Sequence, residues 1–301
     1  MSTNAYKNVL LVGASGDVGK SILSDLLADP DFKVSVLSRS DSTAKFPPNI
    51  NVIKVNYSDQ SALSQSLTGQ DIVISTVGGE ALLENFDKTL IGAALAAGVK
   101  WFIPSEYGFD LDDPAASSIP VNIPQLENAE LLKQNQSRMA YTFISTGAFL
   151  DWGLDNSFLC FDIPSRTATL YDEGKHTVSG TVLNNLGKAV VAILRHPELT
   201  LNQRICLADT TFTQQEILAL LEKYTDTKWT VNHVTTQDTL KRAEEEWKKG
   251  NIKDGYFAFL LSLTYGGANT CNFGSKIKNK VLGLKDVTLE QIVREAVQRK
   301  S

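Results

Sequence analysis

The chain has 301 residues, of which 43% are hydrophobic and 21% are charged, as in globular proteins and unlike disordered or collagen-like ones. Its 29 basic and 34 acidic side chains give a formal net charge of −5, a sign that is unfavourable for binding a phosphate backbone. We therefore expect no nucleic-acid partner, and the length predicts one large α/β unit or about two domains.

Three cysteines stand far apart, without the CxxC spacing of zinc ligands or redox pairs: Cys160, Cys206 and Cys271. We therefore expect neither a metal site nor a disulfide framework. No apolar run approaches the ~18 residues that a membrane helix requires. The first strand-like run, at residues 8–12, begins too early to follow a cleavable signal. These features predict a cytoplasmic protein that contacts no membrane.

From residue 8 to about 146, short β-branched runs alternate with helix-like segments, which is the pattern of a parallel sheet covered on both faces. Hydrophobic residues at helical spacing predict helices over 17–28 and 81–97, the second ending at Gly98 as its C-cap. Strands are predicted at 8–12, 33–37, 51–55, 71–75, 100–103 and 140–145.

After residue 150 the pattern loosens into shorter elements, which predicts a smaller second lobe. Thr213 and Glu216 form a capping-box pattern at the start of an amphipathic helix that reaches residue 224. We place the first domain at 1–152 and the second at 153–301. This boundary is approximate, and a segment near 176–209 is a candidate for return to the first domain.

A glycine-rich turn follows the first predicted strand and opens the first predicted helix: Gly13-Ala14-Ser15-Gly16-Asp17-Val18-Gly19. Glycine permits a sharp turn, lets backbone N–H groups approach a pyrophosphate, and lets helix and strand pack closely. The helix N-terminus adds positive potential. The placement of this motif predicts a dinucleotide-binding site.

The end of the second predicted strand carries Arg39, at a place where an enzyme that prefers NAD usually has an acidic residue. A guanidinium can hold a 2′-phosphate with two hydrogen bonds, whereas a carboxylate would repel it. The cofactor predicted from this position is NADP(H). Lys45 is a candidate for a second positive charge.

The carboxyl ends of three further predicted strands carry small or polar residues. In a doubly wound sheet these ends lie at the edge where a dinucleotide crosses, and small side chains leave room for ribose. We predict cofactor contacts from Thr76, Val77, Gly78, Gly79, Ser105, Glu106, Gly147 and Phe149.

Four stretches together resemble the NmrA-like and isoflavone-reductase-like branch of the atypical short-chain dehydrogenases, especially its fungal members: GASGDVG, the Arg39 environment, AGVKWFIPSEYG and YTFISTGAFLDWGL. The resemblance spans nearly the whole chain. It implies an NAD(P)-binding Rossmann domain with a doubly wound parallel sheet, followed by a smaller C-terminal α/β substrate-binding lobe. It also implies NADP(H) as cofactor and phenolic or other secondary metabolites as small-molecule substrates.

Residue by residue, the resemblance assigns the phosphate turn to Gly13, Gly16 and Gly19, the 2′-phosphate contact to Arg39, and a place near the nicotinamide to Phe149. Reductases of this family have a lysine at the start of the helix before the sixth strand, and this chain has Gln125 there. An amide has no proton to give at neutral pH. The nearest lysine, Lys133, lies over two helical turns away, about 12 Å along the axis.

The Tyr-x-x-x-Lys pair of ordinary short-chain dehydrogenases is also missing. The formal matches, Tyr171 with Lys175 and Tyr224 with Lys228, run through turn residues or off a helix end, so neither places both side chains on one helical face. A proton donor, if one is needed, is sought among Tyr107, His176, Tyr171, Asp151 and water.

These observations support three hypotheses. The first is an NADP(H)-dependent reductase that acts on an apolar secondary metabolite, with Gln125 giving a hydrogen bond in place of a proton. The second is a redox-neutral cyclase or isomerase that uses bound NADP(H) as a template or a transient hydride shuttle. The third is a non-catalytic NADP-sensing regulator. We expect a monomer or a homodimer.

Overall fold

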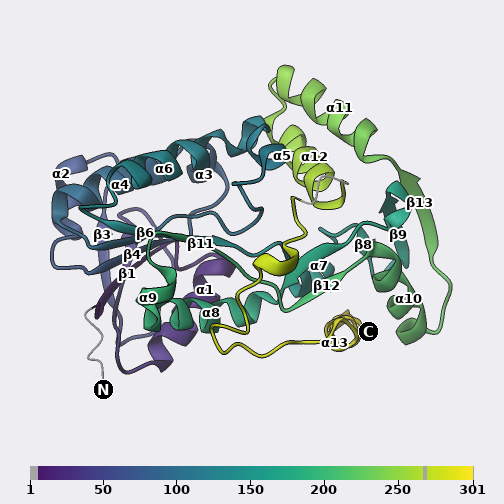
Figure 1. Cartoon of the computed structure of the whole chain (residues 1–301), viewed down its shortest axis with the longest axis horizontal. Coiled ribbons are helices and arrows are strands. Elements are labelled where there is room, and N and C mark those ends of the chain that lie inside the picture. The colour runs from purple at the N-terminus through teal and green to yellow at the C-terminus, as the bar shows by residue number, and fades with distance from the viewer. Residues whose placement is uncertain (1–5, 267–269, 301) are drawn as a thin grey trace. The chain divides into compact units, whose positions relative to one another are not determined.

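The computed structural model describes residues 6–266 and 270–300, and Figure 1 shows the elements along the chain. The chain forms two compact units, each assembled from separate segments. Unit 1 comprises Met1–Glu106, Ile123–Ile144 and Asn184–Ile205, and unit 2 comprises Tyr107–Asn122, Ser145–Leu183 and Cys206–Ser301. The domain boundary near residue 152 and the return of a segment near 176–209 stay predictions.

Unit 1 contains a seven-stranded sheet with the order β11-β6-β5-β4-β1-β2-β3. Its strands are β1 (Asn8–Val12), β2 (Lys33–Arg39), β3 (Asn51–Val55), β4 (Ile72–Ser75), β5 (Trp101–Ile103), β6 (Ala140–Ser145) and β11 (Gln203–Cys206). The strands from β6 to β3 pair in parallel. After β3 the chain returns to the other side of β1, so β1 and β4 form the switch point beyond which such folds bind ligands. The six predicted strands and the doubly wound α/β class are confirmed.

Two elements of unit 1 differ from the prediction. β11 is absent from the predicted strands, because its four residues include only one β-branched side chain, Ile205. The predicted helix over 81–97 is divided into α3 (Glu80–Leu83) and α4 (Phe86–Ala97). Asn85 lies between them with a φ of 55°, a left-handed conformation that asparagine tolerates and that interrupts an α-helix.

Helices cover both faces of this sheet (Figure 1). One face is covered by α2 (Gln60–Ser66), α4 and α6 (Ile123–Gln134), and the other by α1 (Asp17–Ala28), α8 (Leu183–Arg195) and α9 (Pro197–Thr200). Leu63 of α2, Leu90 of α4 and Leu132 of α6 share one core with the strands. Gly98 ends α4 with a φ of 76°, so the predicted C-cap is confirmed.

Unit 2 contains two small sheets. The first is formed by β7 (Ala148–Phe149), β10 (Val178–Thr181) and β12 (Thr210–Phe212), and the second by β8 (Phe161–Asp162), β9 (Thr167–Tyr171) and β13 (Thr230–Val234). Its α-helices are α5 (Pro114–Ser117), α7 (Leu150–Asp155), α10 (Gln214–Thr225), α11 (Thr236–Lys248), α12 (Ile252–Tyr265) and α13 (Leu289–Lys300), and its 3₁₀ turns are η1 (Pro120–Asn122), η2 (Asp172–Gly174) and η3 (Gly274–Lys276). The predicted capping box of Thr213 and Glu216 is confirmed at α10. Among the described helices, none is long and apolar enough to cross a bilayer.

Candidate functional site

The turn between β1 and α1 needs glycine at two positions for its own packing. Gly13 has a φ of 82°, and a Cβ there would lie 2.7 Å from the Thr76 carbonyl oxygen. A Cβ on Gly19 would lie 2.3 Å from the Gly13 carbonyl oxygen. Any other residue at either position would force the backbone to move. These two glycines let α1 start close against β1 and β4.

Gly16 differs, because the chain itself leaves room for a side chain there. The nearest atom to a Cβ on Gly16 would be the Gly13 carbonyl oxygen at 3.5 Å, an ordinary contact. Gly16 is the N-cap of α1 and offers no side chain to the first helical N–H groups. A pyrophosphate requires close backbone approach and available amides, so the turn fits such a group.

The other predicted residues of this turn surround the same amides. Ser15 and Asp17 are exposed, and Val18 is half-buried. Oδ1 of Asp17 lies 3.8 Å from Nζ of Lys20. The turn therefore exposes two polar side chains together with its backbone groups.

Arg39 lies at the same sheet edge as the glycine turn. β1 and β2 pair in parallel with Val12 opposite Leu37, so both segments leave the sheet at its carboxyl end. The Arg39 side chain is 66% exposed, and its Nε lies 3.5 Å from Oδ1 of Asp41. Because exposed ion pairs are weak, a phosphate can compete for this guanidinium. Lys45 is exposed in the loop that follows.

The segment after β4 combines a fixed start with an open end. The backbone N–H and Oγ1 of Thr76 donate to the Val12 carbonyl oxygen at 2.9 and 2.7 Å, and Val77 is buried. By contrast, apart from the adjacent residues, no described atom lies within 4 Å of a Cβ added at Gly78 or Gly79. This segment is rigid at its start and has free space where the sequence predicts a ribose.

Both predicted site residues after β5, Ser105 and Glu106, contact other segments of unit 1. Oγ of Ser105 donates to the Val77 carbonyl oxygen at 2.8 Å. The Glu106 side chain is fully buried, and its Oε2 lies 2.9 Å from Nη1 of Arg204, whose guanidinium stacks 4.9 Å from the ring centre of Phe143. The role of Glu106 as a cofactor contact stays a prediction, and the structure shows it holding β11.

Gln125 lies in the first turn of α6 and is half-buried. Its Oε1 is buried and accepts no hydrogen bond from the residues that the structure describes. Such an unsatisfied acceptor costs about 1–3 kcal/mol, so a donor brought by a bound molecule would be favourable here. Lys133 lies in the last turn of α6, with its Nζ 5.8 Å from the ring centre of Phe143.

The remaining predicted residues belong to unit 2. Gly147 has a φ of 61°, and a Cβ there would lie 2.1 Å from the Ser179 carbonyl oxygen, so only glycine fits. Phe149 is half-buried in β7 and pairs with Thr181 of β10. Tyr107 and His176 are half-buried. Because Gln125 belongs to unit 1, the catalytic grouping of Gln125 with Tyr107 and His176 stays a prediction.

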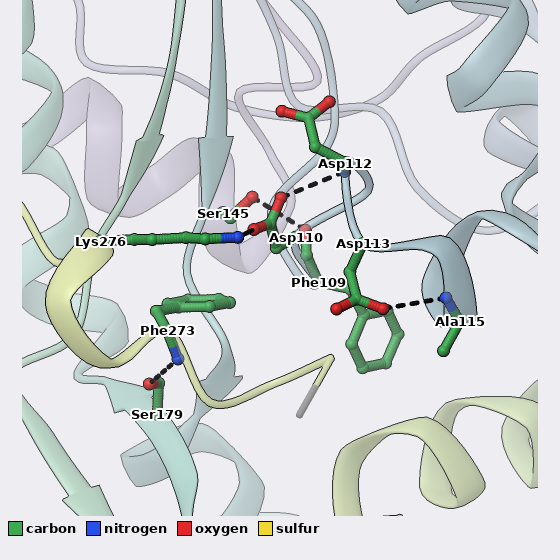
Figure 2. Close-up of polar contacts among 9 residues, drawn as sticks. All are labelled: Phe109, Asp110, Asp112, Asp113, Ala115, Ser145, Ser179, Phe273 and Lys276. Carbon is green, nitrogen blue, oxygen red and sulfur yellow. Dashed lines mark hydrogen bonds and ion pairs between the residues drawn. The ribbon is translucent and has the colours of Figure 1, made fainter. Parts of the chain in front are cut away.

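Unit 2 also contains an ion pair that the sequence does not predict (Figure 2). Nζ of Lys276 lies 2.7 Å from Oδ2 of Asp110, which is buried just after the β5 segment. Three residues farther back on the Lys276 segment, the Phe273 N–H donates to Oγ of Ser179 at 3.0 Å. Asp110 and Lys276 are separated by 166 residues, so no local pattern indicates their contact.

Neither Tyr-x-x-x-Lys match forms a pair, as predicted. Tyr171 ends β9 with its hydroxyl 3.8 Å from Sγ of Cys160. The Tyr224 hydroxyl donates to Glu290, whereas Lys228 pairs with Glu222. Within residues 6–266 and 270–300, no group of three or more His, Cys, Asp or Glu side chains is placed to hold a metal ion.

The parallel sheet with its switch point and glycine turn defines a Rossmann-type α/β protein. The NmrA-like family model matches residues 5–253, so the chain belongs to the NmrA-like family. Oxidoreductase aprR of Aspergillus flavus is 37% identical over 251 residues, which cover 81% of this chain and 82% of that protein. Oxidoreductase poxI of Penicillium oxalicum is 28% identical and covers 99% of this chain and 100% of its own.

Solved structures show the same fold. A structure of AtPrR2 with NADP+ and (+)pinoresinol has a TM-score of 0.78 at 20% identity, covering 97% of this chain and 99% of its own. The binary complex of leucoanthocyanidin reductase with NADPH, from Vitis vinifera, has a TM-score of 0.78 at 21% identity with the same coverage. The predicted family resemblance and fold class are therefore confirmed.

Proposed function

We propose that this protein is an NADP(H)-dependent oxidoreductase that acts on a small apolar secondary metabolite. The observation that carries the proposal is the turn at Gly16 together with Arg39 at one sheet edge, because it offers backbone amides for a pyrophosphate and a guanidinium for a 2′-phosphate. Relatives over most of the chain are named oxidoreductases, and similar structures hold NADP+ or NADPH.

In this proposal different residues of unit 1 bind different parts of the cofactor. The backbone amides in the first turn of α1, next to Gly16, hold the pyrophosphate, while Arg39 and Lys45 hold the 2′-phosphate. The open backbone at Gly78 accommodates the ribose beside the nicotinamide. The bound cofactor supplies a hydride from C4 of its nicotinamide. Gly147, at the end of the sixth predicted strand, and Phe149, which the family resemblance also assigns, stay predicted contacts.

Gln125 orients the substrate without supplying a proton. Its Nε2 donates a hydrogen bond, and its buried Oε1 accepts one from a hydroxyl or N–H group of the bound molecule. Such a group suits an iminium or conjugated acceptor, which needs hydride but little acid assistance. Where a proton is required, Tyr107, His176 or water provides it.

The same amide favours a second candidate, a redox-neutral cyclase or isomerase. A residue that cannot donate a proton suits a reaction in which hydride leaves and returns, or in which the cofactor only shapes the site. Incubation of a metabolite extract with C4-deuterated NADPH separates the two. A product one deuterium heavier, with matching NADP⁺, supports the reductase, whereas a changed product without NADPH loss supports the redox-neutral enzyme.

The cofactor preference is tested by titrating NADPH and NADH into the wild type and Arg39→Glu. We expect the wild type to bind NADPH at least about 10-fold more tightly, since a bidentate guanidinium–phosphate pair is lost with NADH. Arg39→Glu should abolish or invert this preference. Arg138→Glu, which changes an exposed arginine before β6 by the same charge, is the control. Equal affinity of the wild type for both cofactors would refute the proposed preference.

A further inference from the structure

The first turn of α4, residues 85–88, connects four parts of unit 1 near the proposed cofactor site: the segments after β4 and β5, the end of β2, and α6. We call these residues the α4 turn. Asn85 takes a left-handed conformation and separates α4 from α3. The four side chains of the α4 turn contact α6, Tyr57 and the segments after β4 and β5. None of the four is among the predicted site residues.

Asp87 connects the segments that follow β4 and β5. Oγ of Ser75, the last residue of β4, donates to Oδ1 of Asp87 at 2.5 Å. The backbone N–H of Ser105, just after β5, donates to Oδ2 at 2.8 Å. Ser105 in turn donates from Oγ to the Val77 carbonyl oxygen. A single buried carboxyl therefore fixes both segments that flank the open backbone at Gly78.

Phe86 connects the α4 turn with the end of β2. Its ring stacks on Tyr57 with 4.5 Å between ring centres. The Tyr57 hydroxyl donates to the Leu37 carbonyl oxygen at 3.3 Å, two residues before Arg39. Burial raises the pKa of Tyr57 to about 12, although the charge of Arg39 opposes the rise. This hydroxyl therefore stays protonated and keeps its hydrogen bond.

Asn85 and Lys88 connect the α4 turn with α6, the helix of Gln125. Nδ2 of Asn128 donates to Oδ1 of Asn85 at 2.8 Å. Nζ of Lys88 lies 2.9 Å from Oε2 of Glu127. The two contacts hold the second turn of α6 against the start of α4.

The placement of Asp87 is costly for a residue with only a packing role. Its side chain is 2% exposed, and in the part of the chain that the structure describes no cationic side chain pairs with it. The two hydrogen bonds and the N-terminus of α4 compensate only partly for the lost hydration of a carboxylate. A hydrophobic residue would fill this space at less cost, but it could not join Ser75 to Ser105.

We infer that the α4 turn is the positioning element of the cofactor site and that Asp87 is its positioning residue, joining the segments after β4 and β5 so that cofactor binding does not have to order them. This inference rests on the proposed function. It assigns Asp87 no contact with cofactor or substrate. Binding is tighter when the receiving segments are already ordered, so loss of the carboxyl should weaken binding.

The test compares Asp87→Ala and Asp87→Asn with Asp71→Ala. Asp71 is a matched control, because it is also a buried aspartate of unit 1 and accepts several hydrogen bonds, from Lys7, Asn8 and Lys100, next to the other end of β4. Below the melting temperature, we expect Asp87→Ala to weaken NADPH binding about 10-fold and Asp71→Ala to leave it within about twofold. Asp87→Asn should stay within about threefold of the wild type, because an amide can accept from Ser105 and donate to Ser75.

Hydrogen exchange without cofactor provides a second, independent readout. In Asp87→Ala, peptides covering 75–79 and 102–106 should exchange faster, while in Asp71→Ala they should exchange as in the wild type. Ser75→Ala, which removes one of the two hydrogen bonds and no charge, should show a smaller effect of the same kind and serves if Asp87→Ala does not fold.

Unchanged NADPH affinity in Asp87→Ala, or equal weakening in Asp71→Ala, would overturn the inference. If the wild type binds neither NADPH nor NADH, the proposed function fails, and the exchange rates alone then decide on the α4 turn. Unchanged exchange in 75–79 and 102–106 would show that Asp87 does not hold these segments.

Discussion

The two ends of β4 each lie beside a buried aspartate, and the two carboxyl groups have different kinds of partner. At the amino end, Asp71 accepts hydrogen bonds from the backbone of Lys7 and Asn8 and pairs with Lys100 at 2.7 Å. At the carboxyl end, Asp87 accepts from Ser75 and Ser105. Only the first of the two has a cation as partner.

This difference appears in the pKa values. Burial opposes ionisation of Asp71, yet the Asn8 and Lys7 amides and the Lys100 ammonium together hold its pKa below the ordinary value. Burial raises the pKa of Asp87, and its hydrogen bonds from Ser105 and Ser75 offset this only in part. The amino end of the strand is built for stability, whereas the carboxyl end carries an electrostatic cost at the edge where such folds bind ligands.

Glu106 is a third buried carboxyl, and it lies at the carboxyl edge of the sheet with a cation as its partner. It tests whether a neighbouring cation accounts for the difference between Asp71 and Asp87. Arg204→Met removes the guanidinium that lies 2.9 Å from Glu106. We expect the free energy of unfolding to fall by about 3–5 kcal/mol, because the carboxylate stays buried without this partner. The double variant Arg204→Met/Glu106→Gln should recover much of the loss. A fall below about 1 kcal/mol in chemical denaturation would contradict the comparison.

Two glycines of the β1–α1 turn, Gly19 and Gly16, differ in the same way: one is required by packing, and the other has room for a side chain. In Gly19→Ala the Cβ would lie 2.3 Å from a carbonyl oxygen, so we expect a loss of about 2–3 kcal/mol in stability together with weaker NADPH binding. Gly16→Ala has room within the chain, so its melting temperature should change little while NADPH affinity falls. A Gly16→Ala protein that binds NADPH like the wild type would show that no ligand approaches this position.

These examples explain how far the sequence could predict the site. The roles of Gly13, Gly16 and Gly19 are local, because they depend on a strand, a turn and a helix that are adjacent in sequence. Asp87 has the ordinary position of an aspartate in a first helical turn, and its partners Ser75 and Ser105 lie 12 and 18 residues away. The hydrophobic periodicity of a sequence does not predict such contacts, because they depend on how two strands and a helix pack together in the fold.

The left-handed Asn85 and the pair of Arg204 with Glu106 were missed for the same reason. Asn85 lies within a segment whose apolar residues follow helical spacing, and the pattern does not indicate its left-handed conformation. Arg204 lies on a strand that carries too few β-branched residues to be recognised. The fold class was predictable because alternation of strands and helices repeats along the chain, but these contacts occur once.

The pH dependence of stability should distinguish the two ends of β4. Because folding lowers the pKa of Asp71, its carboxylate stabilises the protein above the unfolded value of about 3.9 and loses this effect as the pH falls through the folded value. Because folding raises the pKa of Asp87, the wild type loses stability as the pH rises from about 3.9 through the folded value.

Urea denaturation of Asp71→Asn and Asp87→Asn between about pH 2 and pH 8 measures both effects, because the Asp71 contribution is lost only below about pH 3.9. At pH 7 we expect Asp71→Asn to cost about 1–3 kcal/mol, since charge-assisted hydrogen bonds are lost, and Asp87→Asn to cost less than about 1 kcal/mol or to stabilise the protein. Two variants with the same loss and the same pH profile would remove the distinction between the ends.

The smallest effect concerns an exposed carboxylate at the carboxyl edge. Asp41 lies 3.5 Å from Arg39, where it competes with a 2′-phosphate for the guanidinium. We expect Asp41→Asn to tighten NADPH binding about twofold to threefold and to leave NADH binding unchanged, with a gain that shrinks as salt is added. Asp254→Asn, an exposed aspartate of unit 2, controls for the change in net charge. An equal gain for NADH, or in the control, would mean that Asp41 acts through overall charge and does not compete with the 2′-phosphate for Arg39.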